Sequence, residues 1–239
     1  ITVGGDCTIG CTDAQRSRSD GFAAVVKDKG YAWPFSGLVD VFSRDDLTLV
    51  NFEGTLTESA DKVDKKFNFK GPAEYAKILI LGSVEAVTLA NNHYGDFGEQ
   101  GKADTRAALS AQGIVYCASK APAVYEVRGV KIGLIGNTFP YENGKRDISG
   151  DVKALRDQGC QIVVASFHWG SEYEPYTRDQ RNIGRAAIKA GADVVVGHHP
   201  HVIQGIERYE GTYILYSLGN LVFGGNTDPG DRDAYVAQL

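Results

Sequence analysis

The sequence has 239 residues, of which 43% are hydrophobic and 23% are charged, and its formal net charge is −5. This balance is typical of a globular chain with a full core, and the acidic net charge disfavours nucleic acid as a partner. No apolar run approaches the roughly 18 residues that span a bilayer. Because the chain has no repeat and no obvious linker, we interpret residues 1–239 as a single domain.

The cysteines and the N-terminus bear on whether the protein is exported from the cytoplasm. None of the four cysteines forms a C-x-x-C pair, which disfavours a structural zinc knuckle and favours small, buried apolar side chains. One disulfide remains possible if the protein is exported. No signal peptide is visible, yet the chain opens directly on the strand-like Ile1-Thr2-Val3, which suggests that a targeting segment has been removed.

Short apolar runs alternate with helical patterns along the chain, which indicates βα units and a largely parallel sheet. The strand-like runs are 1–4, 47–52, 84–90, 162–167 and 193–196. The helical candidates are 35–43, 73–81, 99–112, 151–158 and 178–190.

Two further stretches are typical of β-hairpins, because each places a glycine turn between two apolar runs. They are 123–127 with 130–135, and 202–209 with 212–218. The total of about nine to eleven strands exceeds what one sheet commonly carries, so we expect two packed mixed sheets with helices outside. The lysine-containing stretch 62–70 includes Asp64 and directly follows Asp61, and we interpret it as a solvated loop.

All five histidines lie in three short stretches, and each stretch follows a strand-like run. They are His93, His168, and the group His198, His199 and His201. Two other runs end at Asp6 and Glu53. The carboxyl ends of parallel strands meet at one edge of a sheet, which is where ligands bind in open α/β folds. We therefore expect these side chains to lie together although they are far apart in sequence.

Local spacing supports a shared pocket. On extended backbone, residues i and i+2 face the same way, so His199 and His201 form a pair that Pro200 restrains. Asn51 and Glu53 share this spacing, whereas His198 is expected to point opposite to His199.

The ligand set contains oxygen and nitrogen but no thiolate, which favours Mn, Fe, Zn or Mg, and of these we expect Mn, Fe or Zn. The candidate metal ligands are Asp6, Glu53, Asn92, His168, His199 and His201. Six ligands exceed what one tetrahedral ion needs and suit two divalent ions bridged by a carboxylate. His93 is the candidate proton donor, and an orienting role beside Asn92 is the alternative.

Six motifs resemble those of the bacterial CapA family, which makes poly-γ-glutamate capsules and is similar to calcineurin-like metallophosphoesterases. They are Gly5-Asp6, Asn51-Phe52-Glu53-Gly54, Leu89-Ala90-Asn91-Asn92-His93 with Asp96 and Gly98, His168-Trp169-Gly170 with Glu172, Gly197-His198-His199-Pro200-His201, and Tyr216-Ser217-Leu218-Gly219-Asn220. The resemblance implies a four-layer α/β/β/α sandwich with a dinuclear centre between two sheets. It assigns Asp6 and His201 to one ion, the set Asn92, His168 and His199 to the other, and the bridge to Glu53.

The sequence departs from the metallophosphoesterase pattern at two places, both in the expected metal centre. The usual Asp-x-His is replaced by Asp6-Cys7-Thr8, and the usual bridging Asp by Glu53. We expect Asn51, His198, Glu172 and Asn220 to contact the substrate or orient the ligands, and for His198, Glu172 and Asn220 a structural role is the stronger alternative.

Two functions stay open. One is a metal-dependent hydrolase of a phosphoester or of an amide in a cell-envelope polymer. The other is a non-catalytic metal-binding subunit of a membrane complex that makes or exports poly-γ-glutamate. The resemblance further implies an extracytoplasmic, membrane-anchored or secreted protein that meets an anionic polymer.

Overall fold

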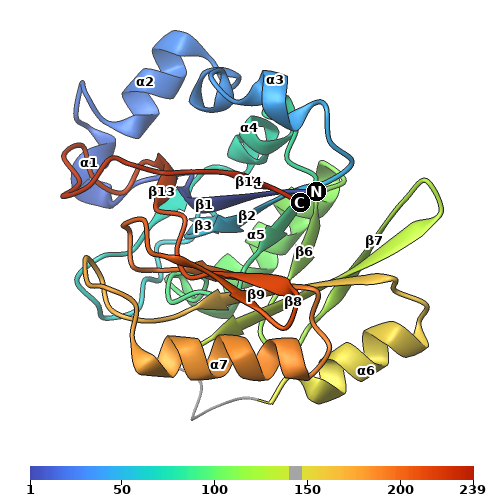
Figure 1. Ribbon diagram of the computed structural model, residues 1–239. Helices are drawn as coiled ribbons and strands as arrows, with labels where there is room; N and C mark the ends of the chain where they lie inside the picture. The colour runs from blue at the N-terminus through green and yellow to red at the C-terminus, as the bar shows by residue number, and fades with distance from the viewer. Residues whose placement is uncertain (140–146) are drawn as a thin grey trace.

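The computed structural model describes residues 1–139 and 147–239, and its strands form two six-stranded sheets and one small pair (Figure 1). The first sheet has the order β13 (Asn220–Phe223), β1 (Thr2–Thr8), β2 (Thr48–Phe52), β5 (Ala86–Thr88) and β6 (Val115–Cys117). These strands are parallel, and β14 (Ala237–Gln238) pairs antiparallel with β1. The small pair is β3 (Thr55–Leu56) with β4 (Lys70–Gly71).

The second sheet has parallel inner strands and antiparallel edges. Its order is β11 (Ile206–Tyr209), β12 (Thr212–Leu215), β10 (Val194–His198), β9 (Ile162–His168), β8 (Val130–Thr138) and β7 (Ala123–Val127). Both edges are the expected hairpins, β7–β8 and β11–β12. Each turn has two residues with positive φ, Arg128-Gly129 and Glu210-Gly211, which is the backbone twist that joins hairpin strands best.

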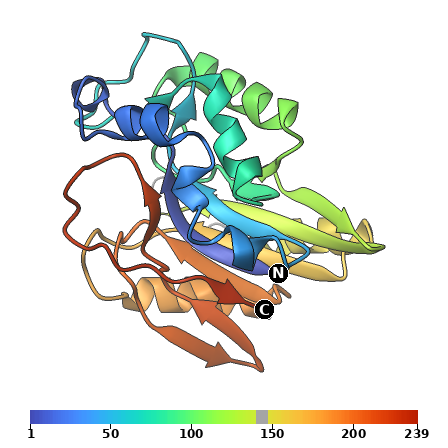
Figure 2. The same cartoon turned by 90° about the horizontal axis from the view of Figure 1, so that it is seen from above.

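Helices cover the outer face of each sheet (Figure 2). Over the first sheet and its edge lie α1 (Asp13–Arg16), α2 (Phe22–Lys29), η1 (Trp33–Phe35), α3 (Val39–Phe42), η2 (Ala73–Tyr75), α4 (Ala76–Leu81) and α5 (Gly98–Ala111). Over the second lie α6 (Ser149–Asp157) and α7 (Arg178–Lys189). This arrangement confirms the expected four-layer α/β/β/α sandwich with mixed sheets.

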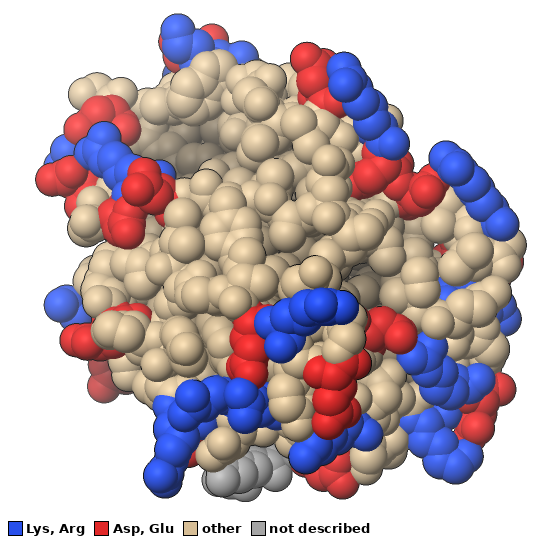
Figure 3. Space-filling model, viewed as in Figure 1, with Lys and Arg blue, Asp and Glu red and all other residues tan. Residues whose placement is uncertain are grey.

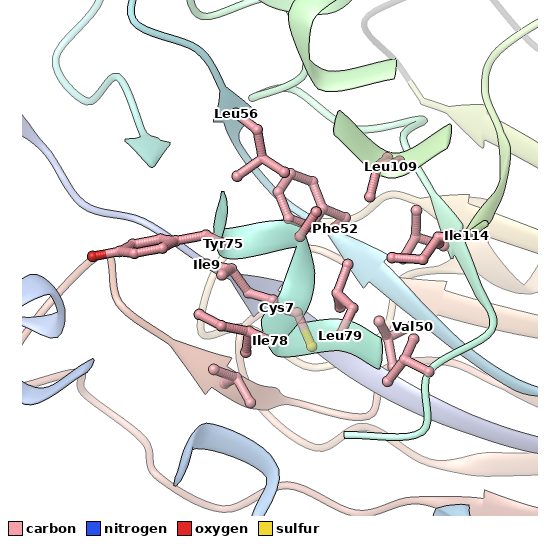
Figure 4. Packing of buried hydrophobic residues seen from close by; sticks show 14 of the residues in the cluster. Cys7, Ile9, Val50, Phe52, Leu56, Tyr75, Ile78, Leu79, Leu109 and Ile114 are labelled. Carbon is pink, nitrogen blue, oxygen red and sulfur yellow. The ribbon is translucent and has the colours of Figure 1, made fainter. Parts of the chain in front are cut away.

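Three buried apolar clusters occupy the three spaces between the layers. In the outer cluster of the first sheet, Phe52 and Leu79 pack together with Cys7, whose sulfur lies among apolar carbons (Figure 4). The middle cluster, with Leu49 and Val164, joins the two sheets. Fully burying each such side chain contributes about 1.5–3 kcal/mol, so these clusters hold the strand ends in fixed positions.

Some expectations about the elements are wrong. The helix expected over 35–43 is split into η1 and α3, because Pro34 and Gly37 interrupt a regular helix there. Helices α1 and α2 were not expected; α2 buries only Val26, so its apolar pattern is weak. The strands number more than the expected nine to eleven, because β3, β4 and β14 have only two residues each.

The cysteines bear on the possible disulfide, and the helices bear on whether a segment could span a membrane. All four cysteines lie in described segments and are buried and unpaired, so the disulfide left open by the sequence does not form in this structure. Across residues 1–139 and 147–239, every helix is too short or too polar to cross a membrane.

Candidate metal centre

Asp6 lies within β1, two residues before the strand ends, and is fully buried. Its Oδ1 accepts a hydrogen bond of 2.8 Å from Asn51 Nδ2 on β2, and its Oδ2 accepts one of 3.2 Å from the backbone N–H of His199. The register of β1 with β13 shifts between Asp6 and Cys7. Asp6 thus connects the two sheets, since His199 follows β10 of the second sheet.

Glu53 follows β2 directly and is also fully buried. Both carboxylate oxygens lack a hydrogen-bond partner among the described residues. Its Oε1 lies 3.8 Å from His168 Nε2, 3.9 Å from His93 Nε2 and 4.0 Å from His201 Nε2. Burial raises the pKa of Glu53 to about 8, and the negative charge of Asp6 adds to the shift. A buried carboxylate without a donor is costly unless a cation neutralises it.

His168 ends β9 and brings the second sheet to the same point. Its Nε2 lies 2.9 Å from Asn92 Oδ1, and its Nδ1 lies 3.4 Å from Asn51 Nδ2. Burial and the neighbouring positive charge of His199 lower the pKa of His168 well below its usual range. Neutral imidazole is the form that binds a metal, so this environment suits a ligand.

His199 and His201 also lie at this cluster, but the sequence did not indicate the backbone conformation that places them there. Strand β10 ends at His198, and the backbone then takes positive φ at His199 (96°) and His201 (58°). The expectation of extended backbone is therefore wrong here, although both rings face the cluster, with centroids 6.0 Å apart. Asn220 Oδ1 lies 2.8 Å from His201 Nδ1, so Asn220 orients this ring.

His198 also lies beside Asp6 rather than away from the cluster. Its Nδ1 is 3.5 Å from Asp6 Oδ1. The expectation that it points opposite to its neighbour is wrong, because strand alternation stops where the backbone turns at His199. Burial would raise the pKa of Asp6, but the neighbouring rings of His198 and His201 outweigh it and lower that pKa well below its usual range.

Among residues 1–139 and 147–239, three groups of side chains each bring their potential ligand atoms within 4.8 Å of one another. They are Glu53–His168–His199, Asp6–Glu53–His201, and Glu172–His199–His201. The first two share Glu53, and Asn92 borders the first through His168. The donors are nitrogen and oxygen atoms, and the shared carboxylate has no hydrogen bond in the described chain. These residues therefore fit divalent metal ions, with the grouping that the motifs imply.

His93 lies at the edge of the cluster and is held by Asp96. Its Nδ1 is 2.8 Å from Asp96 Oδ2, which leaves Nε2 directed toward Glu53. Lys65 Nζ lies 2.7 Å from Asp96 Oδ1 and 3.2 Å from His93 Nδ1. Burial lowers the pKa of His93, although the Asp96 hydrogen bond opposes that shift.

Asp96 and Lys65 were not among the expected site residues. The spacing of His93 and Asp96, three residues apart within a matched motif, was a usable signal. Lys65 carried none, because it lies in the stretch that the sequence indicated as a solvated loop. That expectation is wrong for two lysines: Lys65 binds Asp96, and Lys70 is 9% exposed and lies over the Phe97 ring.

A pocket of about 320 Å³ opens beside the cluster. Aromatic side chains make up much of its wall, with Phe67 and Phe69 stacked and Phe223 edge-on to Phe69. His93 and His201 lie at its inner end, and the exposed Glu172 lies at its rim. The pocket therefore offers apolar surface immediately next to the potential metal ligands.

The surface seen in Figure 3 agrees with the acidic, mixed composition. Acidic and basic side chains alternate around the rim of this face, and uncharged residues cover its centre. No broad basic patch is visible on this face.

Comparison with known proteins identifies the family. Residues 1–225 match the family model described as bacterial capsule synthesis protein PGA_cap. The chain belongs to this capsule-synthesis family. It is 34% identical to the PGA biosynthesis protein CapA of Bacillus subtilis, with 83% of this chain and 59% of that protein covered. For the capsule biosynthesis protein CapA of Bacillus anthracis, the identity is 29%, with 83% and 56% covered. The chain thus spans less than two thirds of these relatives.

Two solved structures of other proteins have a similar fold. A novel phosphatase from Mycoplasma pneumoniae has a TM-score of 0.58 at 14% identity, covering 92% of this chain and 71% of that one. The NAD nucleotidase of Haemophilus influenzae has a TM-score of 0.51 at 15% identity, covering 81% and 44%. These likenesses confirm a metallophosphoesterase-like fold and extend to the fold alone.

Proposed function

We propose that this chain is a divalent-metal-dependent hydrolase that cleaves a phosphoester or an amide during capsule or cell-envelope polymer metabolism. The observation that carries the proposal is the Glu53 carboxylate, which is fully buried, lacks hydrogen bonds within the described chain, and is shared by two groups of ligands. Within those groups the counter-charge is His201, whose Nε2 lies 4.0 Å from Glu53 Oε1, and it faces two carboxylates, those of Asp6 and Glu53. Two bound ions would neutralise both carboxylates, so two ions are the arrangement that this chemistry favours.

The ligand set divides between two ions. Asp6 and His201 would hold one ion, the set Asn92, His168 and His199 would hold the other, and Glu53 would bridge them. Mn, Fe and Zn all accept such a mixture of imidazole and oxygen ligands. When bound, a pair of ions supplies Lewis-acid polarisation of the scissile group and activation of water.

The protein groups around the ions have separate roles. His93, with its Nδ1–H held by Asp96, would act in its doubly protonated form and deliver the proton on Nε2 to the leaving oxygen or nitrogen, which leaves a neutral imidazole. The positive charge of Lys65 lies next to this pair. Asn51 and Asn220 hold Asp6 and His201 by hydrogen bonds, which limits their movement. The aromatic pocket would exclude water and bind an apolar part of the substrate.

A turnover assay tests this function. Metal-free protein is reloaded with Mn²⁺ or Zn²⁺ and assayed with bis(p-nitrophenyl) phosphate, p-nitrophenyl phosphate and γ-glutamyl-p-nitroanilide, which separate diester, monoester and amide cleavage. We expect activity on at least one substrate that chelation abolishes and His93→Ala reduces by about 10²- to 10⁴-fold. Activity that survives both treatments contradicts the proposal, because it comes from another source.

The second candidate is a non-catalytic metal-binding subunit of a poly-γ-glutamate synthesis or export complex. It is favoured by the sequence Asp6-Cys7-Thr8, since Cys7 packs into the outer core and Thr8 offers no imidazole. Metal binding without turnover on any of the three substrates would support it. In either case we propose an extracytoplasmic location, next to an anionic polymer and a membrane-bound synthesis complex. The names of the relatives, which refer to PGA and capsule biosynthesis, support the polymer part of this proposal.

A further inference from the structure

The two proposed ions are unequally provided with protein ligands. Glu53, Asn92, His168 and His199 give the second ion four donors. The first has only Asp6, Glu53 and His201, because Thr8 stands where metallophosphoesterases carry a histidine. Thr8 Oγ1 is buried and without a hydrogen bond in the described chain. A site with three protein donors has room for another ligand from outside the expected set.

Glu172 is positioned to supply that ligand. Its carboxylate belongs to the group in which potential ligand atoms of Glu172, His199 and His201 lie within 4.8 Å of one another. Because Glu172 lines the rim of the aromatic pocket, it approaches the histidines from the solvent side.

The loop that carries Glu172 is tied to the loop that carries the histidines. The backbone N–H of Tyr173 donates a hydrogen bond of 2.8 Å to the carbonyl oxygen of Pro200. Tyr173 has a positive φ of 60°, and its ring centroid is 6.3 Å from that of His201. A non-glycine residue keeps this conformation only when its surroundings impose it, so the approach of Glu172 is a defined feature of the fold.

We propose that Glu172 is a metal ligand that closes the solvent side of the centre, taking the place of the imidazole missing at Thr8. This proposal rests on the metal centre of the proposed function, but not on hydrolysis. Its carboxylate would bind the ion held by His201 and would reach toward His199. An exposed carboxylate ligand also places negative charge at the pocket rim, so anionic groups would be disfavoured there unless the ion neutralises it.

Calorimetric titration of metal-free protein with Mn²⁺ and Zn²⁺, with bound metal counted by elemental mass spectrometry, tests the proposal. The variants are Glu172→Gln and, as the matched control, Glu174→Gln, which removes an exposed carboxylate two residues away in the same loop. We expect Glu172→Gln to weaken one of two binding steps by at least about 10-fold, and Glu174→Gln to leave both unchanged.

The outcomes separate the two proposals. Wild-type affinity for both ions in Glu172→Gln overturns the ligand assignment, whatever the turnover. Weakened binding in Glu172→Gln, with no turnover by the loaded wild type, supports the ligand and counts against the hydrolase. Because Glu172 is exposed, its replacement is not expected to unfold the protein, and equal melting temperatures of the two metal-free variants check this.

Discussion

Asp96 Oδ2 accepts a hydrogen bond of 2.8 Å from His93 Nδ1, so that His93 presents only Nε2 to the centre of the cluster. Asp96 is fully buried and is held in turn by Lys65 Nζ and by the backbone N–H of Phe69. A carboxylate held in this way determines which imidazole nitrogen carries the proton and fixes the plane of the ring.

Asp96→Asn is therefore expected to lower kcat by about 10²-fold or more while the bound metal stays at the wild-type level. The amide is uncharged, so Lys65 and His93 lose the negatively charged carboxylate that both contact. Turnover of loaded protein and elemental mass spectrometry measure the two quantities. A parallel loss of metal would show instead that Asp96 supports the ligands rather than His93.

Glu53→Gln is expected to abolish tight metal binding, because the shared carboxylate lies in both ligand groups. The metal-free variant should melt at about the same temperature as the metal-free wild type near neutral pH, since a pKa of about 8 leaves Glu53 mostly protonated there and the amide is a neutral group of the same shape. Calorimetry of the two metal-free proteins makes the comparison. Glu85→Gln is the control, because Glu85 accepts a hydrogen bond of 2.7 Å from the Thr48 backbone N–H, far from the cluster. Metal affinity that is equal in Glu53→Gln and wild type would rule out the bridging role.

Phe67→Ala is expected to raise KM for aryl phosphoesters by roughly 3- to 10-fold with little change in kcat. Phe67 is 47% exposed and stacks on Phe69 in the pocket wall, so the change removes binding surface without opening the core. Tyr213→Ala provides the comparison, since Tyr213 is 44% exposed and lies on β12 outside this pocket. Equal KM values in Phe67→Ala and wild type would mean that the substrate does not occupy the pocket.

Glu207→Gln is expected to destabilise the protein near neutral pH but not in acid. Partial burial would raise the pKa of Glu207, but hydrogen bonds from Arg185 and Tyr216 outweigh it and lower that pKa below its usual value. A lowered carboxyl pKa stabilises the fold above the unfolded-state pKa of about 4.3, and this contribution is lost as pH falls through the folded-state pKa.

The expected loss is up to about 1 kcal/mol, since the Arg185 side chain is 41% exposed and water screens the pair. Urea unfolding of wild type and Glu207→Gln at pH 7 and near pH 3 measures it. A difference between the two proteins that is as large at pH 3 as at pH 7 would assign the effect to packing rather than to charge.

The strand ends were predictable from sequence, because burial leaves a clear apolar run before each polar residue. This is why Asp6, Glu53, Asn92, His168, His199 and His201 were expected to lie together, as they do; their binding of metal stays a prediction. The backbone after β10 was not predictable, since the positive φ values of His199 and His201 are imposed by contacts with Asp6 and Asn220.

The supporting residues were harder to predict for a physical reason. Lys65 reaches Asp96 across 31 positions of sequence, and no local pattern marks such a pair. The short elements had the same difficulty: β3 and β4 have two residues each, and they form because α5 packs against β3. Elements of this size follow from tertiary contacts rather than from intrinsic propensity.

The position of the cluster between the sheets has a consequence for folding. Asp6, Glu53 and Asn92 come from one sheet and His168, His199 and His201 from the other, and each sheet has its own outer core. An ion bound by both sets would bind only when the sheets are docked, so binding and docking are thermodynamically linked. Above the dissociation constant, each tenfold rise in the free ion concentration would then stabilise the docked arrangement of the two sheets by about 1.4 kcal/mol. The concentration of available metal would therefore set the lifetime of the folded protein.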